Sequence, residues 1–238
     1  MLRFRERVAA LVAMAVTASL VPVATAQATQ QATLAGFDIS ASQGVPDFNA
    51  AKANGAAFAF IKDTAGVGYV NPNFLDQFRG LKAAGIIRGA YHYARPDSTS
   101  GAEQARYLHD HDGKWFTDGM TLPPTLDMED TQGVAHCYNL TPQAMVAWIA
   151  DFSSTLRQLT GHTPIIYTTT SWWKACTGNS SAFAADHVLW LARYNTEIGE
   201  QPAGWTAKFW QSGVTGPLPG NQDTFFGTLD QLRALTTG

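Results

Sequence analysis

The feature that most constrains the fold is a series of short apolar runs that alternate with longer helical segments. Strands that are apolar on both faces are typical of parallel sheets covered by helices on each side. The sequence therefore predicts an α/β protein. The predicted strands span residues 35–39, 58–61, 86–93, 125–128, 165–168, 188–192, 207–210 and, more weakly, 221–225.

Helical segments separate the early strands and become scarce later. Predicted helices span residues 48–54, 73–84, 101–110 and 141–159. The last begins with Thr141 as a cap and Pro142 at the first helical position, and ends at Gly161. The later strands follow one another with too few residues for full crossover helices. We therefore predict an irregular TIM-like β/α barrel with mostly parallel strands, in which the last helices are reduced or missing.

The amino terminus has the pattern of a secretory signal peptide. An uncharged apolar run over residues 8–21 follows three basic residues, and Ala24-Thr25-Ala26 offers a cleavage site. A membrane anchor is the weaker interpretation, because the run is shorter than the roughly 20 residues that a span needs and Pro22 interrupts its end. We predict a signal peptide at 1–26, a short extension at 27–34 and a single catalytic barrel domain at 35–238, secreted to the extracellular space.

Charge composition excludes some classes of partner. Charged residues make up 15% of the chain, the formal net charge is −3, and no block of Lys and Arg occurs. Nucleic acid is therefore not an expected partner, and no membrane association is expected after signal removal. Aromatic residues reach 11%, which suits stacking on sugar faces as well as ordinary core packing. A monomer is the default expectation.

The two cysteines, Cys137 and Cys176, are an even number in a chain predicted to be exported, so we expect them to pair. Two free thiols, one of them catalytic, are the alternative, but neither lies in a recognisable Cys/His nucleophile context. His109 and His111 stand two residues apart without the spacing of a zinc site. The sequence therefore predicts no metal and no cofactor.

Acidic residues lie at the carboxyl ends of two of the predicted strands, where a parallel barrel places its catalytic groups. Asp38 lies near the end of the first strand, and Asp127 and Glu129 lie at the end of the fourth. Residues two apart on a strand share a face, so these two carboxylates should lie on one side with Cα atoms roughly 6.5 to 7 Å apart. Such a pair keeps one proton, as glycosidic cleavage requires. A solvated acidic loop is the alternative, because Asp130 follows directly.

The order of these motifs resembles the lysozymes of glycoside hydrolase family 25, which are N-acetylmuramidases. The resemblance runs from about Gly36 to the carboxyl terminus. It rests on the following segments: Gly36-Phe37-Asp38-Ile39-Ser40, Phe60-Ile61-Lys62, Ile87-Arg88-Gly89-Ala90-Tyr91-His92-Tyr93-Ala94-Arg95-Pro96, Leu126-Asp127-Met128-Glu129, Ile166-Tyr167-Thr168, Trp172-Trp173, Trp190-Leu191-Ala192-Arg193-Tyr194 and Phe209-Trp210-Gln211. It implies a secreted barrel enzyme that cuts the β-1,4 bond between N-acetylmuramic acid and N-acetylglucosamine in peptidoglycan, and it supports the predicted disulfide.

The resemblance also implies roles for individual residues. Glu129 corresponds to the general acid, Asp127 to its partner carboxylate, and Asp38 to the acid at the end of the first strand. We expect a retaining mechanism in which the substrate's acetamido oxygen attacks the anomeric carbon while Asp127 orients it; a covalent carboxylate intermediate is the alternative. The residues expected to bind substrate are Tyr91, Tyr93, Tyr167, Trp190, Trp210, Asn221 and Asp223.

Several positions depart from the family pattern. Asn221 stands where relatives usually carry an aspartate, which leaves Asp223 two residues later. Ala65 replaces a usual Glu, Ala41-Ser42 replaces a bulkier pair, and Ser212 stands where Tyr is common. Because Asn cannot ionise, Asn221 can position a group but cannot carry a charge. We expect activity, weakened or with an altered preference; a peptidoglycan-binding barrel without turnover and a chitinase-like hydrolase are the alternatives.

Overall fold

A computed structural model describes Leu2 and residues 32–237. The chain divides into two units, Met1–Gln30 and Gln31–Gly238, and the architecture below is that of the second. The predicted signal peptide, apart from Leu2, and most of the predicted extension at 27–34 lie outside the described residues, so their boundaries stay predictions. Among the described residues, none of the helices combines the length and the apolar character that crossing a bilayer demands.

Eight strands close into a barrel, and a ninth short strand pairs at its rim. In the described part of the chain the sheet order is β1-β9-β8-β7-β6-β5-β4-β2-β3, and pairing of β1 with β2 completes the closure. The predicted barrel is therefore confirmed. The strands are β1 (Thr33–Ile39), β2 (Phe58–Ala65), β3 (Tyr69–Val70), β4 (Ile87–Tyr93), β5 (Thr125–Asp127), β6 (Ile165–Thr169), β7 (Leu189–Ala192), β8 (Ala207–Gly213) and β9 (Asn221–Phe226).

The barrel wall is parallel except for β9. Strands β1, β2, β4, β5, β6, β7 and β8 form consecutive parallel pairs, whereas β9 runs antiparallel to both β1 and β8. The register places Asn221 opposite Asp38 and Asp223 opposite Gln211. A parallel strand reaches the mouth of the barrel with its last residues, but β9 reaches it with its first. The carboxyl ends of the other strands and the start of β9 therefore meet at one end of the barrel.

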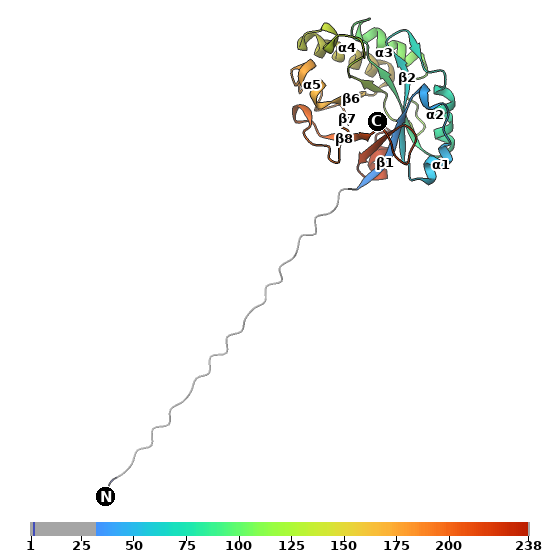
Figure 1. Cartoon of the computed structure of the whole chain (residues 1–238), viewed down its shortest axis with the longest axis vertical. Coiled ribbons are helices and arrows are strands. Elements are labelled where there is room, and N and C mark those ends of the chain that lie inside the picture. The colour runs from blue at the N-terminus through green and yellow to red at the C-terminus, as the bar shows by residue number, and fades with distance from the viewer. Residues whose placement is uncertain (1, 3–31, 238) are drawn as a thin grey trace. The chain divides into compact units, whose positions relative to one another are not determined.

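Helices cover the barrel unevenly (Figure 1). They are α1 (Phe48–Ala53), α2 (Phe74–Ala83), α3 (Gly101–Asp110), α4 (Pro142–Thr160), α5 (Thr170–Thr177) and α6 (Leu229–Ala234), and among the described residues only a short 3-10 turn joins β7 to β8. The sequence did not predict α5 and α6. Helix α5 begins directly after β6, in a run of three threonines that favours strand, and α6 has only six residues.

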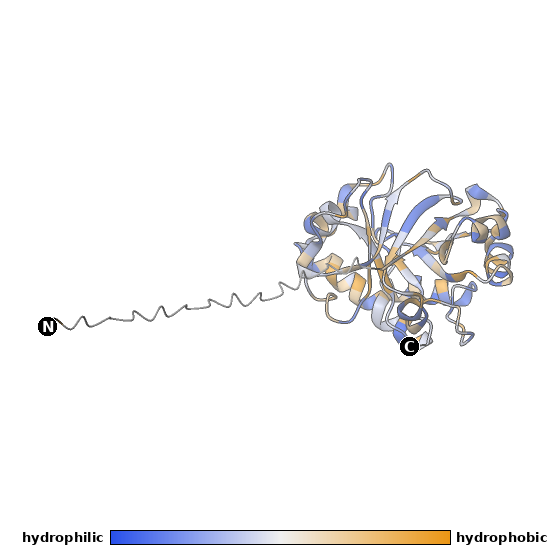
Figure 2. Ribbon diagram, turned by 90° about the horizontal axis from the view of Figure 1, so that it is seen from below, coloured by the Kyte–Doolittle hydropathy of each residue, from blue (hydrophilic) through white to orange (hydrophobic). Residues whose placement is uncertain are grey.

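Aromatic rings fill the barrel interior. The Phe60 ring stacks on Trp190 with 4.2 Å between ring centroids, and Phe209 packs edge-on against Phe60 at 5.1 Å. Two further apolar clusters lie between the strands and the outer helices. Hydrophilic and hydrophobic residues alternate along those helices, as expected when only one helix face is buried (Figure 2). A solid core of rings supports the mouth of the barrel from below.

The predicted disulfide is present. Cys137 and Cys176 are bonded, with 5.1 Å between their Cα atoms, and join the 3-10 turn His136–Asn139 to helix α5. The disulfide links two elements that lie outside the strands of the barrel.

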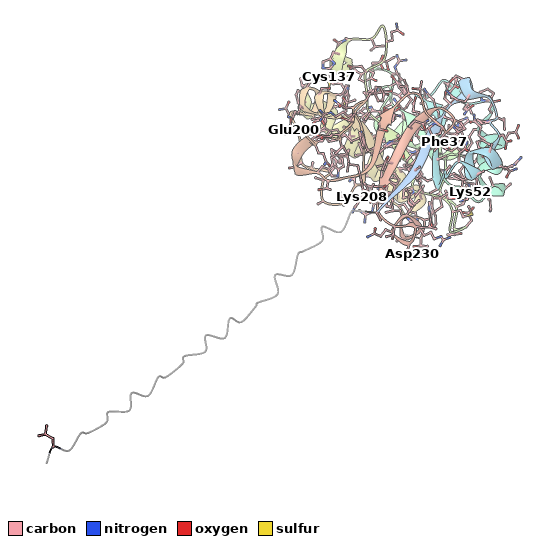
Figure 3. All side chains as sticks on the ribbon, turned by 60° about the horizontal axis from the view of Figure 1, so that its bottom comes forward. Phe37, Lys52, Cys137, Glu200, Lys208 and Asp230 are labelled. Carbon is pink, nitrogen blue, oxygen red and sulfur yellow. A yellow bond between two sulfur atoms is a disulfide. The ribbon has the colours of Figure 1, made fainter. Side chains whose placement is uncertain are left out.

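The charged side chains of Lys52, Glu200 and Asp230 are exposed around the domain, while Phe37 is completely buried (Figure 3).

Candidate active site

The predicted acids meet in one cleft at the mouth of the barrel. Asp38 comes from β1, Asp127 is the last residue of β5, and Glu129 follows two residues later. All three line a narrow cleft of about 100 Å³. Its other lining residues are Tyr91, Tyr167, Trp190, Tyr194, Gln211 and Asn221. Seven strands and the two segments that follow β5 and β7 thus direct side chains into a single small volume.

Asp127 and Glu129 share a face, as the strand alternation predicts. Met128 between them is fully buried on the other face, and its amide donates to the Tyr167 carbonyl oxygen at 2.9 Å, which continues the strand pairing past Asp127. Burial raises the pKa of Glu129 to about 7, against the lowering effect of the Lys62 ammonium. Burial and the Glu129 charge raise the pKa of Asp127 well above its usual range. The pair therefore holds a proton at neutral pH.

Asp38 is the third acid of the cleft, and two amides hold it. The Gln211 side-chain amide donates to one carboxylate oxygen, and the Asn221 Nδ2 donates to the other at 3.1 Å. Burial raises the pKa of Asp38 to about 6, while these two hydrogen bonds lower it. Asn221 therefore supplies a donor to Asp38, which an ionised aspartate at this position could not do.

Asp223 lies beside this cleft and is 3% exposed. The indole Nε1 of Trp190 donates to its Oδ1 at 2.8 Å. Burial and the nearby charge of Asp38 raise the pKa of Asp223 well above its usual range. Asp223 is not among the residues that line the cleft; it accepts a hydrogen bond from Trp190, which does line it.

Gln211 connects the wall of the cleft to Asp38. Its Oε1 accepts hydrogen bonds from the Tyr167 hydroxyl at 2.9 Å and from the Tyr194 hydroxyl at 2.8 Å, while its Nε2 donates to Asp38. Gln211 and Tyr194 stand in the motifs of the sequence, but we did not predict them as site residues. The signal was available, because Gln211 shares a strand face with the buried Phe209.

Besides Asp223, two further predicted binding residues lie outside this cleft. Trp210 points to the opposite face of β8 from Gln211, donates its Nε1 to the Arg193 carbonyl oxygen at 2.9 Å and stacks near Phe226. This corrects the expectation that Trp210 lines the cleft, since side chains alternate along a strand. Tyr93 lines an adjoining cleft of about 570 Å³, and its hydroxyl donates to the Asp130 carbonyl oxygen at 2.7 Å.

Lys62 was not predicted as a site residue. Its Nζ lies 4.2 Å from the centre of the Tyr93 ring. Burial lowers the pKa of Lys62, and the charges of Asp127 and Glu129 raise it. The ammonium therefore lies between the adjoining cleft and the two carboxyl groups, where it stabilises their ionised forms. It lies on β2, where we identified no acid and so expected no site residue.

In the described part of the chain, one group of side chains has the closeness of metal ligands. It consists of His136, Cys137 and Cys176. Both sulfur atoms are bonded to each other, so neither is a thiolate that could bind a metal. This group therefore provides no metal centre in the oxidised chain.

Comparisons with known proteins agree on one family. A family model described as Glycosyl hydrolases family 25 matches residues 37–221. An N,O-diacetylmuramidase from a Chalaropsis species is 42% identical over 211 residues, covering 87% of this chain and all of the relative. A muramidase structure from Acremonium alcalophilum has a TM-score of 0.84 at 46% identity, covering 86% of this chain and 99% of the other. A bacterial lysozyme structure from Streptomyces coelicolor has a TM-score of 0.83 at 38% identity, with 86% and 97% covered.

Proposed function

Because the chain belongs to glycosyl hydrolases family 25 and is a peptidoglycan-hydrolysing lysozyme, we propose that Glu129 is its general acid and Asp127 the partner carboxylate. One observation carries this assignment. Three acids line a single narrow cleft, and burial there keeps the pKa of Glu129 at about 7. A carboxyl group with such a pKa still carries a proton near neutral pH, which protonation of a leaving oxygen requires.

The proposed bond is the β-1,4 linkage between N-acetylmuramic acid and N-acetylglucosamine. Glu129 gives its proton to the leaving oxygen while the acetamido oxygen of the muramic acid attacks the anomeric carbon, so that a cyclic oxazolinium forms as the bond breaks. Water then opens the ring, with the Glu129 carboxylate taking its proton. Two inversions at one carbon leave the anomeric configuration retained.

Asp127 is suited to orient the acetamido group. Its Oδ1 is buried and accepts no hydrogen bond from the described residues, although Asp127 lines the cleft. A buried acceptor without a partner is unfavourable, and an acetamido N–H of the substrate would satisfy it. With substrate bound, the proton of the pair would lie on Glu129, and the charge of Asp127 would be stabilised by this N–H and by the Lys62 ammonium.

Asp38 and the tyrosines would complete the substrate site. Asp38 is held as an acceptor by Gln211 and Asn221, and Tyr91 and Tyr167 line the same cleft. These groups can bind sugar hydroxyls and the acetamido group. We also propose secretion, as the amino-terminal sequence pattern predicts, since peptidoglycan lies outside the cytoplasm.

The test is turbidity loss of purified bacterial cell walls, with the new reducing ends identified. We expect muramic acid at the reducing ends and little release from chitin, which a chitinase-like enzyme would cut. Glu129→Gln should lower kcat about 100- to 10,000-fold. The matched control is Glu103→Gln on α3. Glu103 is exposed, and glutamine can replace glutamate at its position in the capping box with Ser100. If Glu129→Gln retains wild-type activity, the assignment of the acid is wrong.

A further inference from the structure

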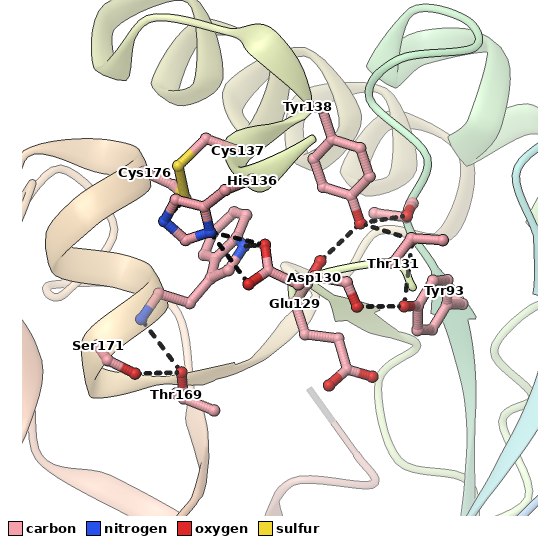
Figure 4. A network of polar contacts seen from close by, with 12 residues as sticks. Tyr93, Glu129, Asp130, Thr131, His136, Cys137, Tyr138, Thr169, Ser171 and Cys176 are labelled. Atoms are coloured by element: carbon pink, nitrogen blue, oxygen red, sulfur yellow. Dashed lines mark hydrogen bonds and ion pairs between the residues drawn. A yellow bond between two sulfur atoms is a disulfide. The ribbon is translucent and has the colours of Figure 1, made fainter. Parts of the chain in front are cut away.

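The segment that carries the acid lies beyond the end of its strand. Strand β5 ends at Asp127, and the carbonyl oxygens of Glu129 and Asp130 accept hydrogen bonds from side chains. The Tyr138 hydroxyl donates to the Glu129 carbonyl oxygen at 2.6 Å, and the Tyr93 hydroxyl donates to that of Asp130 at 2.7 Å (Figure 4). Thr131 joins the two hydroxyl groups, at 3.0 and 3.2 Å. Two tyrosines thus fix the main chain on which Glu129 is mounted.

The side chain of Asp130 is bound by two residues other than the tyrosines. The His136 Nδ1 lies 3.0 Å from both of its carboxylate oxygens, and the Trp172 Nε1 donates to Oδ1 at 3.2 Å. His136 belongs to the same 3-10 turn as Tyr138, and Trp172 belongs to α5. The residue next to Glu129 is therefore bound by both of the elements that the disulfide joins.

The turn that supplies Tyr138 is conformationally unfavourable. Cys137, Tyr138 and Asn139 all have left-handed backbone angles, with φ of 55°, 55° and 58°. Residues other than glycine seldom adopt three such conformations in succession. Surrounding contacts must therefore hold this turn, and the Cys137–Cys176 bond ties its first left-handed residue to α5.

We propose that the disulfide-tethered turn His136–Asn139 is a positioning element for hydrolysis, acting on Glu129 through the Tyr138 hydroxyl and through the link between His136 and Asp130. Tyr138 is 3% exposed and lies beneath the segment, so it does not touch substrate. The turn keeps the Glu129 carboxyl group at the distance from the leaving oxygen at which proton transfer occurs. The inference rests on the proposed role of Glu129.

The position of Asp130 also bears on the proton of the acid. The Asp130 charge is one of the causes that raise the pKa of Glu129, together with burial and Asp38, while Lys62 opposes them. Asp127 faces the same carboxyl group. If the segment loosens, Glu129 becomes more solvated and Asp130 moves away, so the pKa of Glu129 should fall toward its ordinary value. The acid would then lose its proton at a lower pH.

The test is Tyr138→Phe, which removes the hydroxyl and keeps the buried ring. We expect kcat on cell walls to fall about 10- to 100-fold, because a small misplacement of a catalytic group has effects of this size. KM should change less than twofold, and the alkaline limb of the pH–rate profile should move to lower pH. Tyr107→Phe on α3 is the matched control, since the Tyr107 ring packs against His111 outside the cleft.

A second variant tests the tether itself. The double substitution Cys137→Ser with Cys176→Ser should lower kcat in the same direction and move the same limb, measured well below the melting temperature of the variant. Wild-type kcat and pH profile in both variants, with Glu129→Gln inactive, would overturn the positioning role alone. An active Glu129→Gln would instead overturn the proposed acid, and with it this inference.

Discussion

The barrel wall consists of two regions that are built differently and contribute different groups to the cleft. From β1 to β6 the barrel strands are parallel, with only the short rim strand β3 antiparallel among the described residues, and helices α1 to α4 lie between them. From β7 to β9 the described strands follow one another without an α-helix, and β9 is antiparallel. The first region supplies Asp38, Asp127 and Glu129. The second supplies Gln211 and Asn221, which are neutral donors to Asp38. The acids of the cleft thus come from the first region, and the amide donors to Asp38 come from the second.

The antiparallel strand explains how the second region reaches the site. Asn221 is the first residue of β9 and pairs with Asp38 near the end of β1. In a strand parallel to β1, the residue that pairs with Asp38 would be one of the last residues of its strand. A short connection between β8 and β9 therefore suffices to bring an amide to the mouth of the barrel, and a crossover helix is not needed.

The largest effect should come from the first region. Asp127→Asn keeps the size of the side chain but removes the charge that we assign to it, so kcat should fall about 100-fold or more while binding of cell walls is retained. Hydrolysis rates and sedimentation with insoluble walls measure the two properties separately. A decrease in kcat of less than about threefold would mean that catalysis does not use the charge of Asp127. The first region would then not be the one that contributes the catalytic charges.

Gln211→Leu tests the second region. It removes the donor to Asp38 and the acceptor of two tyrosine hydroxyls, so the pKa of Asp38 should rise above about 6 and the acidic limb of the pH–rate profile should move to higher pH. We expect kcat to fall about tenfold at pH 6, a smaller effect than that of Asp127→Asn.

The matched control for Gln211→Leu is its neighbour on the same strand. Trp210→Phe alters a larger side chain on the outer face of β8 and should leave kcat within about twofold. Equal losses in both variants would indicate that β8 is simply destabilised. The acidic limb moves only if the amide of Gln211 acts on Asp38.

The first region was also the easier one to predict from sequence. Long helices with capping residues and buried strands separate clearly there, as in the helix that begins at Thr141 and Pro142. Helix α5 escaped prediction because its threonines favour strands and because it follows β6 without a turn. Its helical form depends on packing, with Trp172 and Trp173 buried, and such tertiary contacts leave little local signal.

The same limit applies to the site. Asp127 and Glu129 could be placed on one side from strand alternation alone, because both lie on a single short segment. The same alternation places Gln211 on the face of Phe209. The hydrogen-bond partners of Gln211 and the position of Lys62 could not be predicted, because they depend on which strands are neighbours in the closed barrel. Trp210 was misplaced because we interpreted the aromatic residue of the Phe209-Trp210-Gln211 motif as a sugar-stacking residue without applying the side-chain alternation to β8.

A smaller effect is expected for Asn221→Asp. In the wild type, activity should be lost as pH falls through about 6, where Asp38 takes up a proton, and as pH rises through about 7, where Glu129 loses its own. A second carboxylate beside Asp38 favours protonation of Asp38, so the acidic limb should move to higher pH with a change in maximal rate of a few-fold. An unchanged limb would show that Asn221 acts only by its shape.

The smallest effect on activity is expected for Asp63→Asn, in the first region but outside the cleft. Asp63 is fully buried, its two carboxylate oxygens have no hydrogen-bond partner among the described residues, and the main chain of Gly113 lies against it. Burial and the charge of Asp112 raise its pKa to about 8. If buried acids of this region matter only within the cleft, kcat at the optimum should not change.

Stability should respond instead, because Asp63 binds its proton more tightly in the folded chain than in the unfolded one. Its contribution to stability is full below about pH 3.8 and is lost as pH rises toward about 8. Asparagine does not titrate, so the stability of Asp63→Asn relative to the wild type should increase over this range, by at most about 1.4 kcal/mol per pH unit. Urea unfolding from pH 4 to pH 8 measures the slope. A difference between the two proteins that does not depend on pH would mean that Asp63 is ionised in the fold, and that burial in the first region does not by itself hold a proton on a carboxyl group.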